Sequence, residues 1–455
     1  MKPFDFSRVL FYLVCGVSAL GLTFAFGLYS GARQNVVYKT IYALKTVIEE
    51  AVWITSEEAS TLTKIHPKHF LHPVRYKGEG VTVNEITDDG SLIMLSGFFQ
   101  DTNEVRLIRR NGAVVARWPI SFSRIFPDPI HLKPPPETDW NIDLHGALVL
   151  PDGSVVFNFE YGGLVKLDRC GNTVWTLAQP THHSVERSEA GGFWVPGRRF
   201  WSKESESPFP PFKTPFREDT VIKVSDDGEA LAEFSVVDLF YKNELEALLT
   251  STGHPFRVEM TWDKEILHLN KIEELTSDIS DDFPLFKAGD LALSMAKYNL
   301  MMVVDPDSRK IKWWRMGPWL RQHDPEFKRG GKLVVFNNNV YRTAYGTDKS
   351  FRSNARATRV SNIMEIDMNT NEHKIIYGGR QNQAMLSIIR GKLELTPRGG
   401  LLVTEFDAGR AFETDPAGRV IWEYINRYSS EKVAGVTEAR VYPTGYFTVT
   451  DWTCE

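Results

Sequence analysis

The segment ALVLPDGSVVFNF, residues 147–159, decides the fold of this 455-residue chain because its pattern recurs along the sequence. Two short apolar stretches flank a turn that contains glycine, which is typical of an antiparallel β-hairpin. Similar hairpins lie at residues 86–95, 185–195, 325–336, 393–406 and 439–449, and a more divergent copy spans residues 267–295. The chain beyond residue 80 is therefore predicted to be all-β.

A second hairpin type alternates with the first. It has a strand, a turn that resembles Asp-x-x-Gly and a second strand that often carries tryptophan. Its copies lie at residues 107–118, 165–175, 222–234, 303–314, 364–377 and 412–424. Alternating hairpins at a period of tens of residues indicate four-stranded blades around an axis. Six copies of one type and seven of the other predict a six-bladed β-propeller with strand exchange at ring closure, and a seven-bladed ring is the alternative.

The N-terminus differs from the rest of the chain in composition. Residues 9–32 contain no charge and exceed the roughly 20 apolar residues that a helix needs to cross a bilayer. A cleavable signal has a shorter apolar core and a small-residue cleavage site. We therefore predict an uncleaved transmembrane signal anchor at residues 1–35. Basic residues lie on both sides of this stretch, so the positive-inside rule does not fix its orientation.

An amphipathic segment follows the apolar stretch. Apolar residues at positions 37, 41, 44, 48 and 51 have the spacing of a short coiled-coil seam. The pattern predicts a stalk helix over residues 36–66, which either lies on the membrane or the globular body or joins copies into a homo-oligomer through 37–51. The propeller is predicted to span residues 75–455.

Histidines occupy equivalent positions in the hairpins of the first type. Five of the 11 histidines lie at or just before the first strand of these copies, namely His145, His182, His183, His268 and His323. Arg390 and Glu438 hold this position in the last two copies. Equivalent strand ends converge near the channel of a propeller, so these side chains are expected to face one another at its mouth. The asparagines at 337–339 are expected to cap a strand end, with one amide within reach of this mouth.

Three chemistries fit such a ring of histidines. Histidine can act as a nucleophile or general base, and converging cations can hold an oxyanion such as sulfate or phosphate. Three neutral imidazoles can also bind a transition metal. The ring lacks H-x-x-x-H and C-x-x-C spacing, so no metal ligands are predicted from the sequence.

Four stretches resemble the bacterial arylsulfotransferase family, a family of PAPS-independent, six-bladed propeller enzymes. They lie at residues 182–195, 267–317, 321–338 and 409–424. The resemblance runs from about residue 140 to residue 450. Its most specific part is the Gln-His-Asp triplet at 322–324, which is followed by a glycine turn and a Phe-x-Asn exit.

The resemblance implies a ping-pong transfer, in which a histidine takes a sulfuryl group from a phenolic sulfate ester and passes it to a phenol or alcohol. His323 matches the nucleophile that forms a transient sulfohistidine. His268, in a His-x-Asn motif, matches the acid/base that acts on the phenolic oxygen. His183 is expected to contact the sulfuryl oxygens, although His182 is the alternative for this role. Neither a cofactor nor a metal is implied.

One position departs from the family pattern. The family has an arginine in a Ser-x-Arg-x-x-Asn stretch, where it neutralises sulfuryl charge, and here Ala296 takes its place. Adjacent residues in a strand point to opposite faces, so Lys297 would replace the arginine only through a bulge or a shift of register. The other candidates for this charge are Arg198, Arg199 and Arg390. The residues expected to bind substrate are His145, His182, Lys297, Asn299 and Arg390.

The sequence thus predicts a membrane-anchored, PAPS-independent sulfotransferase. The first alternative is a catalytically impaired propeller that acts as a binding or scaffold module, which Ala296 favours. A metal-dependent hydrolase or lyase that uses the histidine ring is the second.

The expected partners are an aryl sulfate donor, a phenol or alcohol acceptor and the membrane. A net charge of −5 gives no reason to expect nucleic-acid binding. The expected location is the inner membrane, crossed once, with the propeller on the periplasmic side. Cys170 and Cys454 lie far apart in the sequence, which leaves open whether they pair in an oxidising compartment.

Overall fold

The computed structural model describes most of the chain. The described residues are 6–33, 35–37, 40, 70–87, 89–132, 135–136, 138–202, 208–209, 212, 214, 216–250, 265–340 and 361–454. The chain divides into two compact units, Met1–Pro67 and Lys68–Glu455. The predicted stalk at 36–66, with its seam at 37–51, lies almost entirely outside the described residues.

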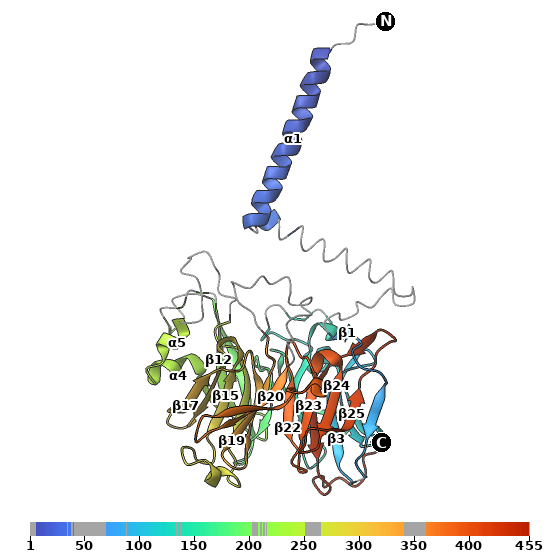
Figure 1. Cartoon of the computed structure of the whole chain (residues 1–455), viewed down its shortest axis with the longest axis vertical. Coiled ribbons are helices and arrows are strands. Elements are labelled where there is room, and N and C mark those ends of the chain that lie inside the picture. Colours follow the sequence, from blue (N-terminus) through green and yellow to red (C-terminus); the bar gives the residue numbers. More distant parts are fainter. Residues whose placement is uncertain are drawn as a thin grey trace. The chain divides into compact units, whose positions relative to one another are not determined.

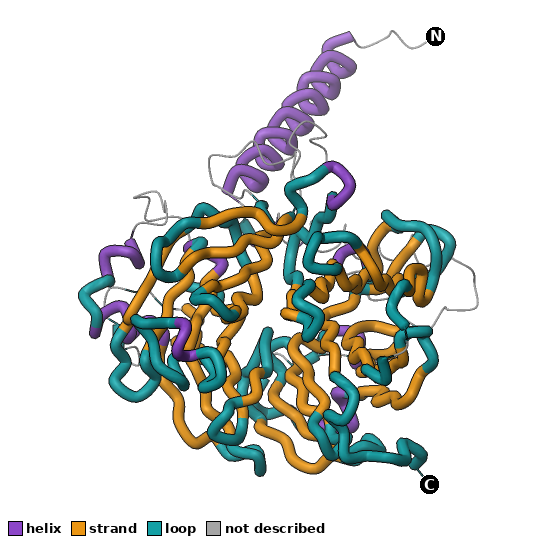
Figure 2. Tube along the Cα trace, turned by 60° about the horizontal axis from the view of Figure 1, so that its bottom comes forward, coloured by secondary structure: helices purple, strands orange, loops and turns teal. Residues whose placement is uncertain are grey.

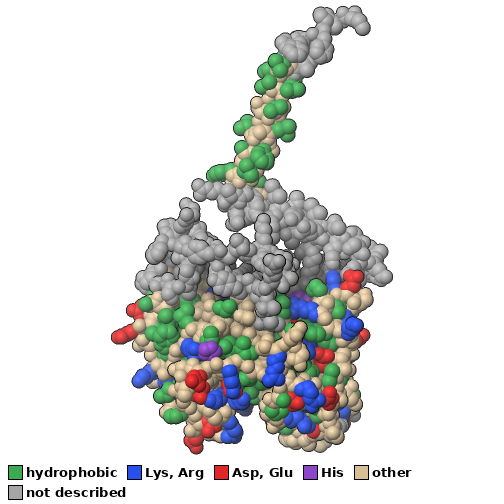
Figure 3. Space-filling model, viewed as in Figure 1, with side chains coloured by type: hydrophobic (Ala, Val, Ile, Leu, Met, Phe, Trp, Pro, Cys, Tyr) green, Lys and Arg blue, Asp and Glu red, His purple; other side chains and the backbone are tan. Residues whose placement is uncertain are grey.

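Helix α1 (Phe6–Arg33) is the main described element of the first unit. Its segment Leu10–Ser30 has 21 residues and a mean hydropathy of 1.9, so it is long and apolar enough to cross a membrane. Apolar side chains cover this segment (Figure 3). A signal sequence near the N-terminus passes the same test. The prediction of an apolar N-terminal helix is therefore confirmed, and its use as anchor or signal stays a prediction.

The second unit contains six antiparallel sheets of four or five strands, arranged around a common axis (Figures 1 and 2). We number them as blades 1 to 6. Blade 1 contains β27 (Val436–Tyr442), β3 (Leu92–Phe99), β4 (Thr102–Arg109) and β5 (Val114–Ile120). Blade 2 contains β6 (Leu144–Val149), β7 (Val155–Phe159), β8 (Gly163–Leu167) and β9 (Thr173–Leu177). Blade 3 contains β10 (Glu186–Arg187), β11 (Phe193–Trp201), β12 (Phe216–Val224) and β13 (Ala230–Ser235).

The remaining blades follow in chain order. Blade 4 contains β14 (Leu269–Glu274), β15 (Leu291–Met295), β16 (Leu300–Val304) and β17 (Ile311–Met316). Blade 5 contains β18 (His323–Lys328), β19 (Lys332–Asn337), β20 (Asn362–Asp367) and β21 (His373–Tyr377). Blade 6 contains β22 (Lys392–Leu395), β23 (Leu401–Glu405), β24 (Arg410–Thr414), β25 (Val420–Ile425) and β2 (Gly80–Asn84). The first strands of neighbouring blades contact one another, as β14 and β18 do, and so lie nearest the axis.

Strands from both ends of the propeller sequence close the ring. The late strand β27 is the innermost strand of blade 1, where it pairs with β3, and the early strand β2 is the outermost strand of blade 6. This closure explains the unequal hairpin counts. The hairpin at 86–95 supplies only a return strand and the one at 439–449 supplies only an inner strand, and these two strands pair in blade 1. The six-bladed prediction is therefore confirmed, and residues 443–449 form no strand.

The blades pack face to face, which buries the middle strands on both sides. All residues of β7 and β16 are buried, whereas only one residue of the outer strand β13 is buried. Val221 of blade 3 and Leu293 of blade 4 share one core cluster. This packing explains why the middle strands are continuous apolar runs rather than alternating ones.

Short helices and a small accessory sheet fill the connections between strands. They are α3 (Phe122–Ile125), η2 (Asp139–Asn141), α4 (Val236–Lys242), α5 (Glu246–Thr250), η4 (Ser280–Asp282), η5 (Ala296–Tyr298), η7 (Gln381–Gln383), η8 (Phe406–Ala408) and the pair β1 (Leu71–Pro73) with β26 (Lys432–Ala434). Helix α4 starts at Ser235, whose side chain accepts the Asp238 N–H and satisfies one of the free donors of the first turn.

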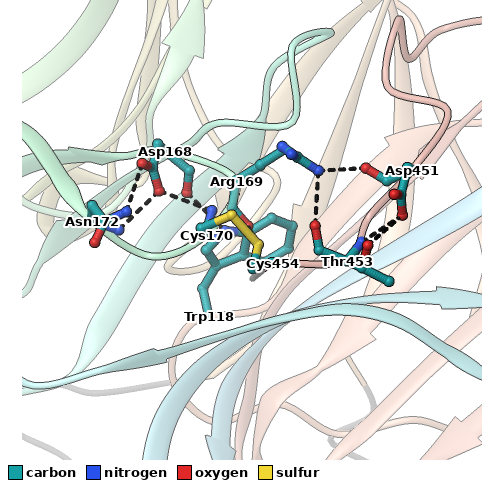
Figure 4. The surroundings of a disulfide bond; sticks show 8 residues. All are labelled: Trp118, Asp168, Arg169, Cys170, Asn172, Asp451, Thr453 and Cys454. Carbon is teal, nitrogen blue, oxygen red and sulfur yellow. Dashed lines mark hydrogen bonds between the residues drawn. A yellow bond between two sulfur atoms is a disulfide. The ribbon is translucent and has the colours of Figure 1, made fainter.

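A disulfide between Cys170 and Cys454 joins the β8–β9 turn to the C-terminal segment (Figure 4). Arg169 donates to the carbonyl oxygens of Asp451 and Thr453 beside it. Trp452 packs at right angles to Trp118 with ring centroids 6.2 Å apart. The bond thus fixes the end of the chain across blades 1 and 2.

We expect replacement of Cys454 by alanine to lower the free energy of unfolding by about 2–4 kcal/mol, because the bond closes a long loop in the unfolded chain. Urea unfolding of the full chain in detergent would measure this loss. Cys15, which is free, provides the control variant Cys15→Ala, whose stability should match that of the unmodified protein. Equal stability of all three proteins would contradict the prediction.

Candidate active site

The predicted ring residues lie at the same end of consecutive inner strands. His145 is the second residue of β6, His182 and His183 precede β10, His268 precedes β14, His323 begins β18 and Arg390 lies two residues before β22. The backbone there is unusual, because φ is 59° at His183, 62° at His268 and 58° at Arg390. Positive φ is uncommon for residues other than glycine and tends to cluster at functional sites.

His183 lies at the centre of the histidine cluster. Its ring centroid is 3.9 Å from that of His145, 4.8 Å from that of His268 and 6.2 Å from that of His323. Gly146 permits this close approach, since a Cβ there would lie 2.2 Å from the His183 carbonyl oxygen. The fold therefore brings together histidines from blades 2, 3, 4 and 5.

His323 is held in one tautomer. Its Nδ1 lies 2.7 Å from Asn338 Oδ1 and 3.0 Å from the Arg321 carbonyl oxygen. The Asn338 amide nitrogen donates to the carbonyl oxygens of Ser387 and Arg390, which orients its Oδ1 toward the histidine. Both neighbours of Nδ1 are acceptors, so Nδ1 carries the proton and Nε2 keeps a free lone pair. Burial lowers the pKa of His323 to about 3, which keeps the ring neutral.

His268 is paired with a carboxylate that the sequence analysis did not identify. Its Nδ1 lies 2.9 Å from Glu265 Oε2. Burial opposes ionisation of Glu265, but its hydrogen bond to His268 and the nearby Arg198 and Lys297 charges hold its pKa well below the usual value. This carboxylate therefore accepts the Nδ1–H of His268 and orients the ring.

The hydrogen bonds of His182 determine the tautomer of the neighbouring His183. His182 Nε2 lies 3.3 Å from the Gly197 carbonyl oxygen and 3.5 Å from Asp219 Oδ1, both acceptors. His182 Nδ1 must then accept the proton of His183 Nδ1, 2.7 Å away. The Nε2 of His183 is left with a lone pair. Burial lowers the pKa of both histidines well below the ordinary value.

The motifs around His268 and His323 are joined directly. The Asn270 side chain donates to the Gln322 carbonyl oxygen over 2.8 Å, and the Gln322 amide donates to Ser294 Oγ over 3.1 Å. Asn299 Oδ1 accepts the Arg321 N–H over 2.7 Å. Asn299, predicted to bind substrate, thus holds the segment that leads into His323.

The segment around Ala296 forms a turn rather than a continuous strand. Ala296 is fully buried in η5, so the alternation expected of a strand does not apply to Lys297. Lys297 Nζ donates to the Glu265 carbonyl oxygen over 2.6 Å and lies 3.3 Å from its Oε2. Arg198 also contacts Glu265, whereas Arg199 pairs with Glu233. Lys297 and Arg198, two candidates to replace the family arginine, therefore both contact Glu265.

Arg390 and His145 carry buried polar atoms without hydrogen-bond partners among the described residues. Arg390 Nη2 contacts Asp143 and lies 3.1 Å from a Glu160 oxygen. Arg390 Nη1 has no partner among the described residues. Both ring nitrogens of His145 also lack partners in the described part of the chain. Buried polar groups in native structures are nearly always satisfied, so these atoms are candidates to bind a polar ligand.

The inner strands also line a charged part of the channel. Lys271 Nζ lies within 3.4 Å of a carboxylate oxygen from each of Glu186, Glu273, Asp324 and Glu326. A cavity of about 250 Å³ is lined by residues that include Lys271, Asp324, Glu326, Lys392, Glu394, Glu438 and Arg440. Burial raises the pKa of Glu326 to about 7 and that of Glu394 to about 8.

These carboxyls predict a pH-dependent stability. A carboxyl with a raised pKa stays protonated in the folded protein but ionises in the unfolded chain, so stability falls as the pH rises from the ordinary value toward the raised one. We expect Glu394→Gln to weaken the fall between about pH 5 and pH 8 by about 1 kcal/mol per pH unit. Urea unfolding across this range measures the slope, with the exposed Glu229→Gln as control. An unchanged slope would show that Glu394 ionises normally.

A model of the family described as "Arylsulfotransferase (ASST)" matches residues 144–427 of the chain. No curated protein matches the sequence. Solved structures with similar folds include a protein of unknown function from Bacteroides caccae, with 12% identity, a TM-score of 0.43 and coverage of 73% of this chain and 93% of that one. A catalytically inactive virginiamycin B lyase from Staphylococcus aureus with quinupristin has 11% identity, a TM-score of 0.40 and coverage of 80% and 91%. The β-propeller domain of Myceliophteria thermophila Cps50 (Swd1) has 7% identity, a TM-score of 0.39 and coverage of 78% and 88%.

Proposed function

This chain belongs to the arylsulfotransferase family, and from that premise we propose that it moves a sulfuryl group from a phenolic sulfate ester to a phenol or alcohol without PAPS. The observation that carries the proposal is the state of His323. Its Nδ1 proton is directed to Asn338 and the Arg321 carbonyl, which leaves a neutral Nε2 as nucleophile. Transfer from 4-nitrophenyl sulfate to a simple phenol tests the proposal.

The transfer proceeds in two halves. His323 Nε2 attacks the sulfur of the donor, an N–S bond forms, and the S–O bond to the phenol breaks. His268 donates a proton to the leaving phenolic oxygen, and the Glu265 carboxylate stabilises the protonated ring that this step requires. The acceptor hydroxyl then attacks sulfur while His268 takes its proton, and the N–S bond breaks to restore the neutral histidine.

The sulfuryl oxygens require positive or hydrogen-bonding groups. Arg390 Nη1 and the nitrogens of His145 are buried without partners among the described residues, and the His183 ring centroid lies 3.9 Å from that of His145. These groups, rather than the missing arginine at Ala296, would receive the sulfuryl charge. Lys297 and Arg198 act more remotely, because both contact Glu265.

The Ala296 substitution favours one second function. If Arg390 and His145 do not replace the family arginine, the histidine cluster remains as a binding or scaffold module without turnover. The activity of the unmodified protein distinguishes these functions. A folded protein that binds aryl sulfate but forms no covalent adduct would support the module.

We also propose that the propeller is anchored on the periplasmic side of the inner membrane. The apolar span of α1 supports an anchor, and the Cys170–Cys454 disulfide fits an oxidising compartment. The predicted oligomer through 37–51 stays part of this proposal.

Deletion of residues 1–35 tests the single anchor. We expect the deleted protein to move from the membrane fraction to the soluble fraction, because roughly 20 apolar residues supply the membrane affinity. Ultracentrifugation of lysed cells measures the distribution, and near-ultraviolet circular dichroism checks that the propeller is folded. Firm membrane association of a folded deletion variant would contradict a single anchor.

A further inference from the structure

Three histidines from consecutive blades bring imidazole nitrogens close together. One nitrogen from each of His183, His268 and His323 lies within 4.8 Å of the other two. Zinc–nitrogen bonds of about 2.0–2.1 Å place tetrahedral ligand nitrogens roughly 3.4 Å apart. Small ring rotations would therefore bring the three nitrogens to coordination distance.

The second nitrogen of each ring is already engaged. His323 Nδ1 faces Asn338 Oδ1, His268 Nδ1 faces Glu265 Oε2, and His183 Nδ1 faces His182 Nδ1. Histidines that bind metals characteristically donate their other N–H to such a partner, which fixes the tautomer and the ring orientation. Because each Nδ1 is engaged, the Nε2 atoms are the ones left to bind a metal ion.

The cations around this cluster are balanced by carboxylates. Three cations lie near the histidine cluster, where they contact carboxylates. They are Arg198, Lys297 and Arg390. Four carboxylates surround the same groups, namely Asp143, Glu160, Asp219 and Glu265. Every one of these cations is paired with a carboxylate. Ala296, which stands where the family carries an arginine, adds no charge that would repel a metal ion.

We propose that His183, His268 and His323 bind one divalent metal ion of the class that prefers imidazole nitrogen, such as Zn²⁺ or Co²⁺. A bound ion occupies the His323 lone pair that the sulfuryl transfer proposed above requires. Metal and sulfuryl donor therefore exclude one another. This site goes beyond the proposed function, because metal binding is measured without any sulfuryl donor.

The test uses the full chain in detergent after treatment with a chelator. Zinc binding is followed by isothermal titration and by metal analysis after dialysis. We expect one zinc per chain and a more than about 100-fold loss of affinity when His183, His268 or His323 becomes alanine. Asn338→Ala should cost roughly 10–100-fold, as expected for a supporting partner. His373→Ala, on the exposed face of β21, is the control and should bind normally.

Cobalt provides a readout that needs no variant. Co²⁺ bound to the unmodified protein should give visible absorption of a tetrahedral nitrogen site, and zinc should abolish it. Absence of binding at about 100 µM zinc, or unchanged binding in folded His268→Ala and His323→Ala proteins, would overturn the site. If the protein binds zinc but catalyses no sulfuryl transfer after chelator treatment, the proposed function is wrong and the metal site stands.

Discussion

His323→Ala should lower sulfuryl transfer from 4-nitrophenyl sulfate to phenol by at least about 10³-fold, because removal of a covalent nucleophile leaves only binding and charge stabilisation. The unmodified chain, mixed with donor alone, should gain the mass of one sulfuryl group. The variant should show no such gain. Intact-mass measurement after rapid mixing, followed by peptide mapping at neutral pH, locates the adduct.

The controls for this experiment separate chemistry from folding. His373→Ala removes an exposed histidine outside the cluster and should retain full activity. Asn338→Ala keeps the nucleophile but removes one of the two acceptors of its Nδ1–H, so it should slow adduct formation without preventing it. An adduct that persists in His323→Ala would assign the nucleophile to another histidine. No adduct in the folded unmodified protein, across several donors, would favour the binding module.

Glu265→Gln should slow turnover of phenyl sulfate by about 100-fold, the usual contribution of an acid–base catalyst. Glutamine still accepts the His268 Nδ1–H, but it carries no charge to stabilise the protonated ring. 4-Nitrophenol leaves readily as its anion and needs little proton donation. The loss with 4-nitrophenyl sulfate should therefore be much smaller, and this ratio identifies a role in proton transfer.

The comparison of two donors excludes a purely structural effect. Damage to the fold would lower kcat for both donors by the same factor. Glu233→Gln is the matched control, because Glu233 likewise pairs with an arginine of blade 3, Arg199, at 2.9 Å. Equal losses with both donors in Glu265→Gln would mean that Glu265 only holds the site together.

The hairpin pattern contained enough information to predict the blades. Turn residues and apolar strands recur because every blade packs between two similar neighbours. The number of hairpins did not decide between six and seven blades, because one blade contains β27 and β3, which come from opposite ends of the propeller sequence. A local pattern cannot reveal which distant half-hairpins pair.

The candidate site was only partly visible in the sequence. His145, His183, His268 and His323 follow the repeat register, and the structure brings them together as expected. The prediction that one asparagine of 337–339 reaches the channel mouth is confirmed by Asn338. Such contacts follow the strand ends that the repeat specifies.

Glu265 was missed because it lies outside the repeat register. Its one local signal was its position three residues before His268. The pairing of Glu265 with Arg198 depends on contact between two blades, which no local spacing encodes. The turn at Ala296 was likewise missed, because its sequence was interpreted as continuous strand.

The closure of the ring also constrains how the protein is made. In β3 every residue is buried, yet Gly97 pairs with Val436, near the other end of the chain. During synthesis this strand therefore lacks its inner partner until β27 has emerged from the ribosome. A ribosome-stalled chain that ends before residue 430 should be cleaved by protease within β3, whereas the completed protein should resist. One buried apolar strand thus needs protection while the residues between β3 and β27 are translated.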